Sequence, residues 1–234
     1  MKNLLLLSNS TLPGDPYFQW PLPHVQAFCE RLNVKKVAFV PFAAVTFSFD
    51  KYTEILQKAV KGIGLEIIGI HNNPNALEDA DAVAVGGGNT FALLKRTYEA
   101  GLVEKIQEKV NSGMPYMGWS AGSNMSCPFI FTTNDMPIVE PPSFKALNLV
   151  PFQINPHYTN KTLPNHGGET RDARINEFIA INDKMHVAAI PEGSLIEIEN
   201  GKPFYKGVGE LKHFKNGQEP TVYGEQDDIS FLMG

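Results

Sequence analysis

Cysteine is scarce in this chain, which has only Cys29 and Cys127 among its 234 residues. The two lie far apart in the sequence, without Cys-x-x-Cys spacing or neighbouring histidines, so we expect neither a disulfide framework nor a zinc site. Long apolar runs are also lacking. The opening run 4–7 is shorter than the roughly 7–15 apolar residues of a signal peptide, and no stretch approaches the roughly 18 residues of a membrane span. We therefore expect a cytoplasmic protein without a membrane partner.

Positive charge is limited as well. The chain has 20 Lys and Arg against 25 Asp and Glu, a formal net charge of -5, which disfavours nucleic acid as a partner because phosphate repulsion would not be offset. An acidic small substrate is still allowed, because one local Arg or Lys can outweigh a weak global field. With 43% hydrophobic and 19% charged residues, the composition is ordinary for a globular protein. We expect one domain over residues 1–234, as a monomer or a homodimer.

From residue 4 to residue 190, apolar runs of strand length alternate with helical patterns. Strands are predicted at 4–8, 36–42, 65–70, 82–85, 114–119, 152–155 and 187–190. Helices are predicted at 23–32, 50–61, 90–99, 102–111 and 170–181. Fully apolar strands of this kind favour a parallel sheet covered on both faces. We therefore predict an α/β fold, a three-layer α/β/α sandwich with a mostly parallel central sheet.

The remaining segments follow a different pattern. Residues 132–147 are rich in Pro, Asn and Asp, which predicts a long loop. From residue 194 onward, short strands are separated by Gly and Asn. These strands are predicted at 195–199, 203–206, 211–214 and 221–223. We expect them to form antiparallel hairpins packed on the same central sheet.

The motif Gly-x-Ser-x-Gly at residues 118–122 is the strongest chemical signal. It follows an apolar strand and precedes a segment that is compatible with a helix, which is the context that makes this motif meaningful. A nucleophile on such a tight turn needs small neighbours, and the turn pushes its hydroxyl into the cleft. Ser120 is therefore the candidate nucleophile of a serine hydrolase, although an ordinary serine in a glycine-bounded turn would have the same sequence.

A glycine run at residues 86–88, followed by Asn89 and Thr90, is the second signal. It also follows a strand and opens a helix, and its glycines leave the backbone amides unobstructed. Two roles are open: the run could supply an oxyanion-hole amide opposite Ser120, or it could hold a phosphate. It lacks the Gly-Lys-Ser/Thr ending of a P-loop and the spacing of a dinucleotide fingerprint.

A serine nucleophile requires a base and an acid that orients the base. His157 follows the strand predicted at 152–155, so we place it at the carboxyl edge of the sheet, where open α/β folds bind their ligands; His166, in a nearby loop, is the second choice. Glu192, at the end of the strand 187–190, is the first candidate for the acid, and Asp135 is its rival. The order Ser-His-Glu differs from the Ser-acid-His order of the α/β-hydrolases, which disfavours a lipase or esterase of that fold.

Several longer motifs resemble the peptidase E family of α-aspartyl dipeptidases, which are serine peptidases related to the cyanophycinases. The motifs that carry the resemblance lie at residues 6–11, 86–90, 118–122, 132–139, 153–157, 168–171 and 191–193. The resemblance runs in register from the first strand to Glu192 and fades after residue 194. It implies a fold similar to that of the class I glutamine amidotransferases, with serine in place of their cysteine.

The resemblance also implies a function and a set of roles. It implies hydrolysis of small peptides that begin with aspartate. We expect no cofactor and no metal, because the sequence has no His-x-x-Glu-His-type cluster and the serine route needs none. Ser120 would be the nucleophile, His157 the base and Glu192 the orienting acid, and the amides of Gly88 and Ala121 would form the oxyanion hole. Asp135 also lies in a matching motif, where its role could be catalytic or structural.

A substrate that begins with aspartate needs a cation for its side chain, because a carboxylate that loses water is costly unless a positive charge meets it. Arginine suits this role, since its planar fork holds both oxygens. Of the four arginines, Arg171 is the best placed: it lies at the start of the helix 170–181 and in a motif that the resemblance covers. The alternative is a surface ion pair between Arg171 and Glu169 or Asp172.

Two other functions are compatible with these signals. A non-catalytic α/β protein could use the glycine run to hold an anion, and an acyl hydrolase could act on esters instead of peptides. The amidotransferase-like order and the lack of an apolar lid favour peptides over lipids.

Overall fold

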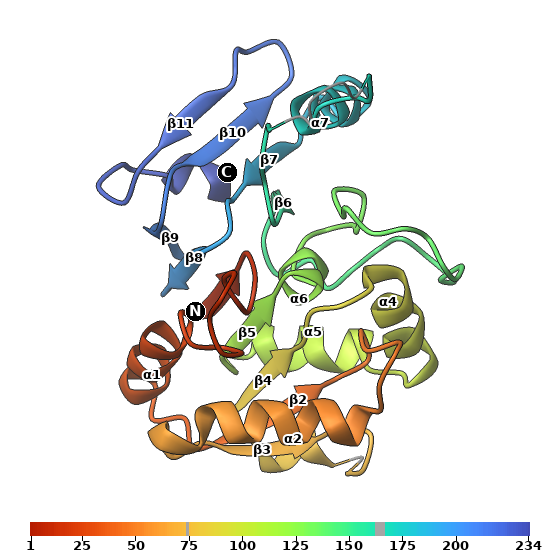
Figure 1. Cartoon of the computed structure of the whole chain (residues 1–234), viewed down its shortest axis with the longest axis vertical. Helices are drawn as coiled ribbons and strands as arrows, with labels where there is room; N and C mark the ends of the chain where they lie inside the picture. Colours follow the sequence, from red (N-terminus) through yellow and green to blue (C-terminus); the bar gives the residue numbers. More distant parts are fainter. Residues whose placement is uncertain (74, 162–166) are drawn as a thin grey trace.

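The computed structural model describes residues 1–73, 75–161 and 167–234, and a seven-stranded sheet forms its centre (Figure 1). The strand order is β3-β2-β4-β5-β1-β8-β9. Five strands are mutually parallel: β1 (Leu4–Leu7), β2 (Lys36–Val40), β3 (Glu66–Gly69), β4 (Ala82–Val85) and β5 (Tyr116–Trp119). Two antiparallel strands follow β1 at the sheet edge: β8 (Ser194–Glu199) and β9 (Lys202–Gly207). The central sheet is therefore mostly parallel, as predicted.

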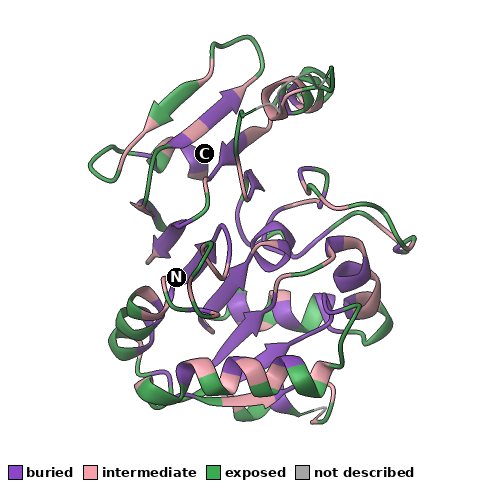
Figure 2. Ribbon diagram, in the orientation of Figure 1, coloured by how far each residue is buried: buried purple, intermediate pink, exposed green. Residues whose placement is uncertain are grey.

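Helices cover both faces of this sheet, because the side chains of its strands alternate between two apolar clusters. In β1, Leu5 and Leu7 pack with α1 (Leu22–Arg31) and α2 (Phe49–Val60). Leu4 and Leu6 pack on the opposite side, with α4 (Thr90–Glu99), α5 (Val103–Asn111) and α6 (Ala121–Met125). Figure 2 shows the strands between these layers as almost entirely buried. The predicted three-layer sandwich is confirmed.

A second sheet of four strands lies beyond the first, in the order β11-β10-β7-β6 (Figure 1). Its strands are β6 (Gln153–Asn155), β7 (His186–Ala189), β10 (Leu211–Lys215) and β11 (Thr221–Tyr223). Helix α7 (Arg171–Ile181) packs on one face of this sheet through Ile175 and Ile179. Residues of the other face, among them Ile154 and Ala188, join the main core. The smaller elements are the short helix α3 (Ala76–Asp79) and two 3-10 turns, η1 (Lys61–Ile63) and η2 (Ser230–Met233).

The prediction that all C-terminal strands pack on the central sheet is wrong in part. Strands β8 and β9 do extend that sheet, but β10 pairs with β7 and β11 pairs with β10 in the second sheet. Strand β6, which leads to His157, also lies in the second sheet. Short apolar strands look alike in sequence, so their hydrophobic pattern does not indicate which sheet edge they join.

The register of three central strands prepares a site at their carboxyl ends. Val85 of β4 lies opposite Gly118 of β5, and Leu7 of β1 lies opposite Trp119. The segments that follow β4, β5 and β1 therefore leave the sheet side by side. In the part of the chain that the structure describes, every helix falls short of the length and hydrophobicity that a membrane crossing requires.

Candidate active site

Ser120 lies on a sharp turn between β5 and α6, with φ of 53° and ψ of -113°. A non-glycine residue in such a conformation costs about 1–3 kcal/mol, which the surrounding structure must supply. The Ser120 amide donates to the Leu7 carbonyl oxygen at 3.1 Å and thereby holds the turn against β1. A Cβ atom at Gly122 would lie 2.0 Å from the carbonyl oxygen of Val85. Only glycine lets the chain pass this close to β4, which explains the small residue in the motif.

The glycine run after β4 packs directly against this turn. A Cβ atom at Gly87 would lie 3.1 Å from Cβ of Ser120. Gly88 has φ of 138°, and a Cβ atom there would lie 2.4 Å from the Ala43 carbonyl oxygen. Within the described residues, the amides of Gly88 and Ala121 donate no backbone hydrogen bond. These two amides are therefore available to bind a negative oxygen that forms near Ser120.

His157 and Glu192 meet Ser120 from the second sheet. His157 Nε2 lies 2.9 Å from Ser120 Oγ, and His157 Nδ1 lies 2.7 Å from Glu192 Oε1. The side chains of His157 and Glu192 are 39% and 44% exposed, so water reaches the contact and weakens its electrostatic part. The structure thus brings together the three residues that sequence analysis named first, in a Ser-His-acid arrangement.

Two polar residues for which the sequence predicted no role, Ser8 and Asn9, support this arrangement through hydrogen bonds. The hydroxyl of Ser8 accepts the backbone N–H of His157 at 2.8 Å and donates to the Ile190 carbonyl oxygen at 2.9 Å. Asn9 Oδ1 accepts the N–H of Gly193 at 3.0 Å, next to Glu192. His157 has φ of 53°, so its backbone needs such support. In the sequence, these supporting roles are indicated by the polar pair Ser8-Asn9, which directly follows an entirely apolar strand.

A pocket of about 290 Å³ opens above Ser120. Its lining residues are Asn9, Ser10, Thr11, Tyr52, Gly87, Gly88, Trp119, Ser120 and His157. The volume lies at the small end of the range for small-molecule sites, about 300–1,000 Å³. The site therefore suits a short substrate better than a long chain.

Asp135 takes part in a different set of contacts. Its Oδ2 accepts the backbone N–H of Thr90 at 2.7 Å and the hydroxyl of Thr90 at 2.6 Å. Thr133 Oγ1 lies 3.2 Å from the same oxygen. Asp135 therefore anchors the beginning of α4, just after the glycine run, and makes no hydrogen bond to His157 among the described residues. Of the two candidate acids, Glu192 is the one in contact with the base.

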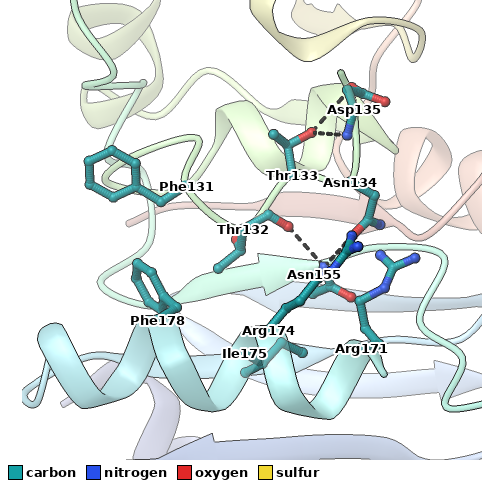
Figure 3. A pocket seen from close by; sticks show the side chains of 10 residues that line it. All are labelled: Phe131, Thr132, Thr133, Asn134, Asp135, Asn155, Arg171, Arg174, Ile175 and Phe178. Atoms are coloured by element: carbon teal, nitrogen blue, oxygen red, sulfur yellow. Dashed lines mark hydrogen bonds between the residues drawn. The ribbon is translucent and has the colours of Figure 1, made fainter. Parts of the chain in front are cut away.

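Arg171 lines a neighbouring pocket of about 140 Å³ (Figure 3). Asn155 and Asp135 line the same pocket, while His157, two residues beyond Asn155, lines the pocket of Ser120. Among the described residues, the two pockets share no lining residue, but the segment 155–157 contributes one residue to each of them. Figure 3 shows Arg171 and Arg174 projecting from the start of α7 toward the segment that carries Asn155.

The environment of Arg171 is unusual for a cation. Its Nη1 atom is buried and has no hydrogen-bond partner among the described residues. The acids that could pair with it are engaged elsewhere, since Glu169 contacts Arg174 and Asp172 contacts Lys212. Burial and then the charge of Arg174 lower the pKa of the Arg171 guanidinium. The surface ion pair considered as the alternative is absent from the described structure.

Two remaining expectations concern the base and metals. His166, the second choice for the base, lies outside the described residues. Within the described ranges, no group of three or more His, Cys, Asp or Glu side chains is arranged to hold a metal ion.

Comparisons with known proteins place these features in a wider context. The model of the family described as peptidase family S51 matches residues 4–204. A protein named Peptidase E from Nostoc sp. (strain PCC 7120 / SAG 25.82 / UTEX 2576) is 46% identical over 235 residues, which cover 99% of this chain and 97% of that protein. Peptidase E from Haemophilus influenzae (strain ATCC 51907 / DSM 11121 / KW20 / Rd) is 47% identical over 204 residues, which cover 86% of this chain and 94% of its own.

A solved structure agrees with these sequence matches. The crystal structure of a candidate peptidase E protein from Listeria monocytogenes EGD-e superimposes with a TM-score of 0.66 at 29% sequence identity. The match covers 89% of this chain and 100% of the Listeria chain. The structural similarity therefore extends over most of this chain.

Proposed function

The chain belongs to peptidase family S51 and is a serine dipeptidase, and we propose that Ser120, His157 and Glu192 perform its chemistry on small peptides that begin with aspartate. The observation that carries the catalytic part is the continuous chain of contacts from Ser120 Oγ through His157 to Glu192, at 2.9 Å and 2.7 Å. Both distances are within hydrogen-bonding range for a nucleophile, a base and an orienting acid.

In this mechanism His157 Nε2 takes the proton of Ser120 Oγ as the oxygen attacks the scissile carbonyl. Glu192 holds the ring through Nδ1 and stabilises the imidazolium that forms. His157 then passes the proton to the leaving amine, and the C–N bond breaks to leave an acyl group on Ser120. A water molecule, activated by His157 in the same way, attacks the acyl group and frees Ser120 together with the N-terminal residue.

The amides of Gly88 and Ala121 are the proposed oxyanion hole. Ala121 directly follows Ser120, Gly88 lines the same pocket as Ser120, and neither amide donates a backbone hydrogen bond elsewhere in the described structure. Backbone donors of this kind are already oriented before the reaction and stabilise the negative oxygen only as it develops. This arrangement favours the oxyanion role of the glycine run over the phosphate-binding role.

Arg171 is the proposed partner of the substrate's aspartate side chain. Among the described residues, the Nη1 atom of this half-buried guanidinium has no hydrogen-bond partner, and with a second cation beside it the group gains stability from an incoming carboxylate. The substrate would place its carbonyl at Ser120 and direct its first side chain along the segment 155–157 toward the pocket that Arg171 lines. That route accounts for a preference set by the first residue of the peptide.

A two-part experiment tests this proposal. A fluorophosphonate probe should label wild-type protein at Ser120 and should not label Ser120→Ala. An absence of labelling in the folded wild type would exclude an activated serine and favour a non-catalytic anion-binding protein instead. If esters are hydrolysed and dipeptides are not, the acyl hydrolase is the better description.

The second part measures specificity as the ratio of kcat/KM for Asp- and Asn-initiated dipeptides. Arg171→Ala should lower this ratio by about 30- to 150-fold, which corresponds to about 2–3 kcal/mol for the lost partner of a partly buried charge pair. Arg171→Lys should restore little, because a point charge does not replace the planar fork. Arg174→Ala is the matched control and should lower the ratio less, since its side chain is 65% exposed and pairs with Glu169. An unchanged ratio in Arg171→Ala would mean that another group selects aspartate.

We also propose that the protein acts in the cytoplasm. Both cysteines are buried and free, which suits a reducing compartment. Cell fractionation with an antibody to the chain tests this location, and recovery outside the cytoplasmic fraction would contradict it.

A further inference from the structure

Tyr52 of α2 connects the two loops that form the proposed oxyanion hole. Its hydroxyl lies 3.0 Å from the carbonyl oxygen of Gly87 and 3.0 Å from Nε1 of Trp119. Trp119 directly precedes Ser120, and Gly87 directly precedes Gly88. A single side-chain oxygen from a helix on one face of the sheet therefore touches the residue before Gly88 and the residue before the nucleophile Ser120.

The direction of these hydrogen bonds is fixed by chemistry. The indole N–H of Trp119 can only donate, and the carbonyl oxygen of Gly87 can only accept. The hydroxyl of Tyr52 must therefore accept from Trp119 and donate to Gly87. Chains of hydrogen bonds that run in one direction polarise one another.

This series of hydrogen bonds ends at the peptide group between Gly87 and Gly88. The Gly87 carbonyl and the Gly88 amide belong to the same planar group, which is trans because the described chain has no cis peptide bond. Its C=O and N–H consequently point in opposite directions. A hydrogen bond that holds the carbonyl toward Tyr52 therefore also fixes the direction of the Gly88 N–H, and Gly88 lines the same pocket as Ser120 and His157.

The surroundings of Tyr52 suit a fixed orienting group. The residue is 5% exposed, and its ring packs edge-on against Phe39 at 5.0 Å between centroids. Burial raises the pKa of the Tyr52 phenol, so it keeps its proton throughout the physiological range. Glycine at positions 86–88 offers no side chain to hold this loop, so an external hydrogen bond is needed to select one peptide orientation.

We propose that Tyr52 is a positioning residue for hydrolysis: it fixes the orientation of the Gly87–Gly88 peptide, and Trp119 strengthens its hydrogen bond. This inference rests on the proposed serine mechanism and adds a residue to it. Tyr52 does not exchange protons with the substrate. It acts through Gly88, whose N–H meets the oxyanion.

The test compares a reactive and an unreactive analogue of the substrate's first residue. The reactive one is the amino aldehyde with the aspartate side chain. Ser120 Oγ adds to its carbonyl carbon, the C=O double bond becomes a C–O single bond, and the Ser120 proton passes through His157 to that oxygen. The unreactive one is the corresponding amino alcohol, which has no aldehyde group for Ser120 to attack and therefore reports binding without the tetrahedral adduct.

Tyr52→Phe should weaken aldehyde binding by about 10- to 100-fold and lower kcat by the same factor. This loss is smaller than the reduction of kcat by about 100- to 1,000-fold that follows when a whole oxyanion donor is removed. KM and the affinity for the alcohol should stay within about threefold, because the hydroxyl contributes to the tetrahedral state and not to ground-state binding. Tyr98→Phe is the matched control: its hydroxyl also donates to a backbone carbonyl, that of Lys145, and both analogues should bind as in the wild type.

Two results would overturn the inference: an aldehyde affinity within about threefold of the wild type, or equal losses for aldehyde and alcohol. If Tyr52→Phe fails to fold, Trp119→Phe is the second variant, because it removes the indole N–H that donates to Tyr52. The ratio of aldehyde affinity to alcohol affinity should then fall by about threefold. An unchanged ratio in Trp119→Phe would count against the inference. Fluorophosphonate labelling of the wild type separates the two levels. If Ser120 is labelled and Tyr52→Phe has no effect, only the role of Tyr52 is refuted, whereas an unlabelled Ser120 refutes the serine mechanism itself.

Discussion

The contact between His157 and Glu192 allows the effect of Glu192→Gln to be estimated. The substitution keeps the size of the side chain but removes the charge that stabilises the imidazolium of His157. Two unit charges about 4 Å apart interact by about 1 kcal/mol in water and about 4 kcal/mol at an effective dielectric constant near 20. Because the two side chains are 39% and 44% exposed, we expect the lower part of this range, about 1–2 kcal/mol. The corresponding loss in kcat is about 5- to 30-fold, far less than the roughly 10,000-fold known for a buried triad acid.

Steady-state kinetics with the p-nitroanilide of aspartate gives kcat and KM for this comparison. Glu219→Gln is the control for a lost negative charge, because Glu219 lies in the exposed turn between β10 and β11. Asp135→Asn should act mainly on stability, with a cost of about 0.5–2 kcal/mol for a weakened helix cap. A Glu192→Gln enzyme with wild-type kcat would refute the reasoning. The reasoning would also be refuted if Asp135→Asn lost more kcat than Glu192→Gln while its melting temperature stayed unchanged.

Four further predictions concern the nucleophile, the turn, metals and pH. Ser120→Ala should keep its circular dichroism spectrum and lose activity by several orders of magnitude; undiminished turnover would exclude the covalent route. Gly122→Ala should lower stability by about 1–3 kcal/mol or more in a thermal melt, because the new methyl group meets the Val85 carbonyl; a wild-type melting temperature would contradict this packing. Extensive chelation should leave the rate unchanged, and a loss restored by zinc or manganese would contradict the serine mechanism. Burial, followed by the charges of His186 and Lys215, lowers the pKa of His213 to about 4. The pKa of an unfolded histidine is about 6.5, so the neutral His213 contributes stability that is fully present above pH 6.5 and is lost as the pH falls toward 4. Urea titrations should show that the free energy of unfolding drops by about 1–2 kcal/mol over this range. His213→Gln should reduce that pH dependence.

Local patterns were sufficient for the elements and for the first candidates of the site. The strand Ala82–Val85 and the helix Thr90–Glu99 have the predicted bounds, because hydrophobic periodicity and the residues around Asn89 act over a few neighbouring positions. The Gly-x-Ser-x-Gly turn at 118–122 is equally local, since its steric requirement lies within five residues. Ser120 could therefore be named without knowledge of any long-range contact.

Contacts between distant segments could not be obtained in this way. The support of His157 by Ser8 joins residues 149 positions apart, and the hydrogen bond between Tyr52 and Trp119 joins residues 67 positions apart. A serine after a strand and a tyrosine in a helix have the same local pattern whether or not they make such contacts. Their roles follow only from how the two sheets pack.

The assignment of strands to sheets and of acids to partners has the same origin. Strand pairing is selected by the burial of whole faces and by register, so β10 and β11 lie in the second sheet although their sequences also suit the central sheet. Glu192 and Asp135 were both plausible acids from their positions in the chain. Folding brings one carboxylate to His157 and the other to the first turn of α4, because hydrogen bonds require separations near 3 Å that sequence distance does not encode.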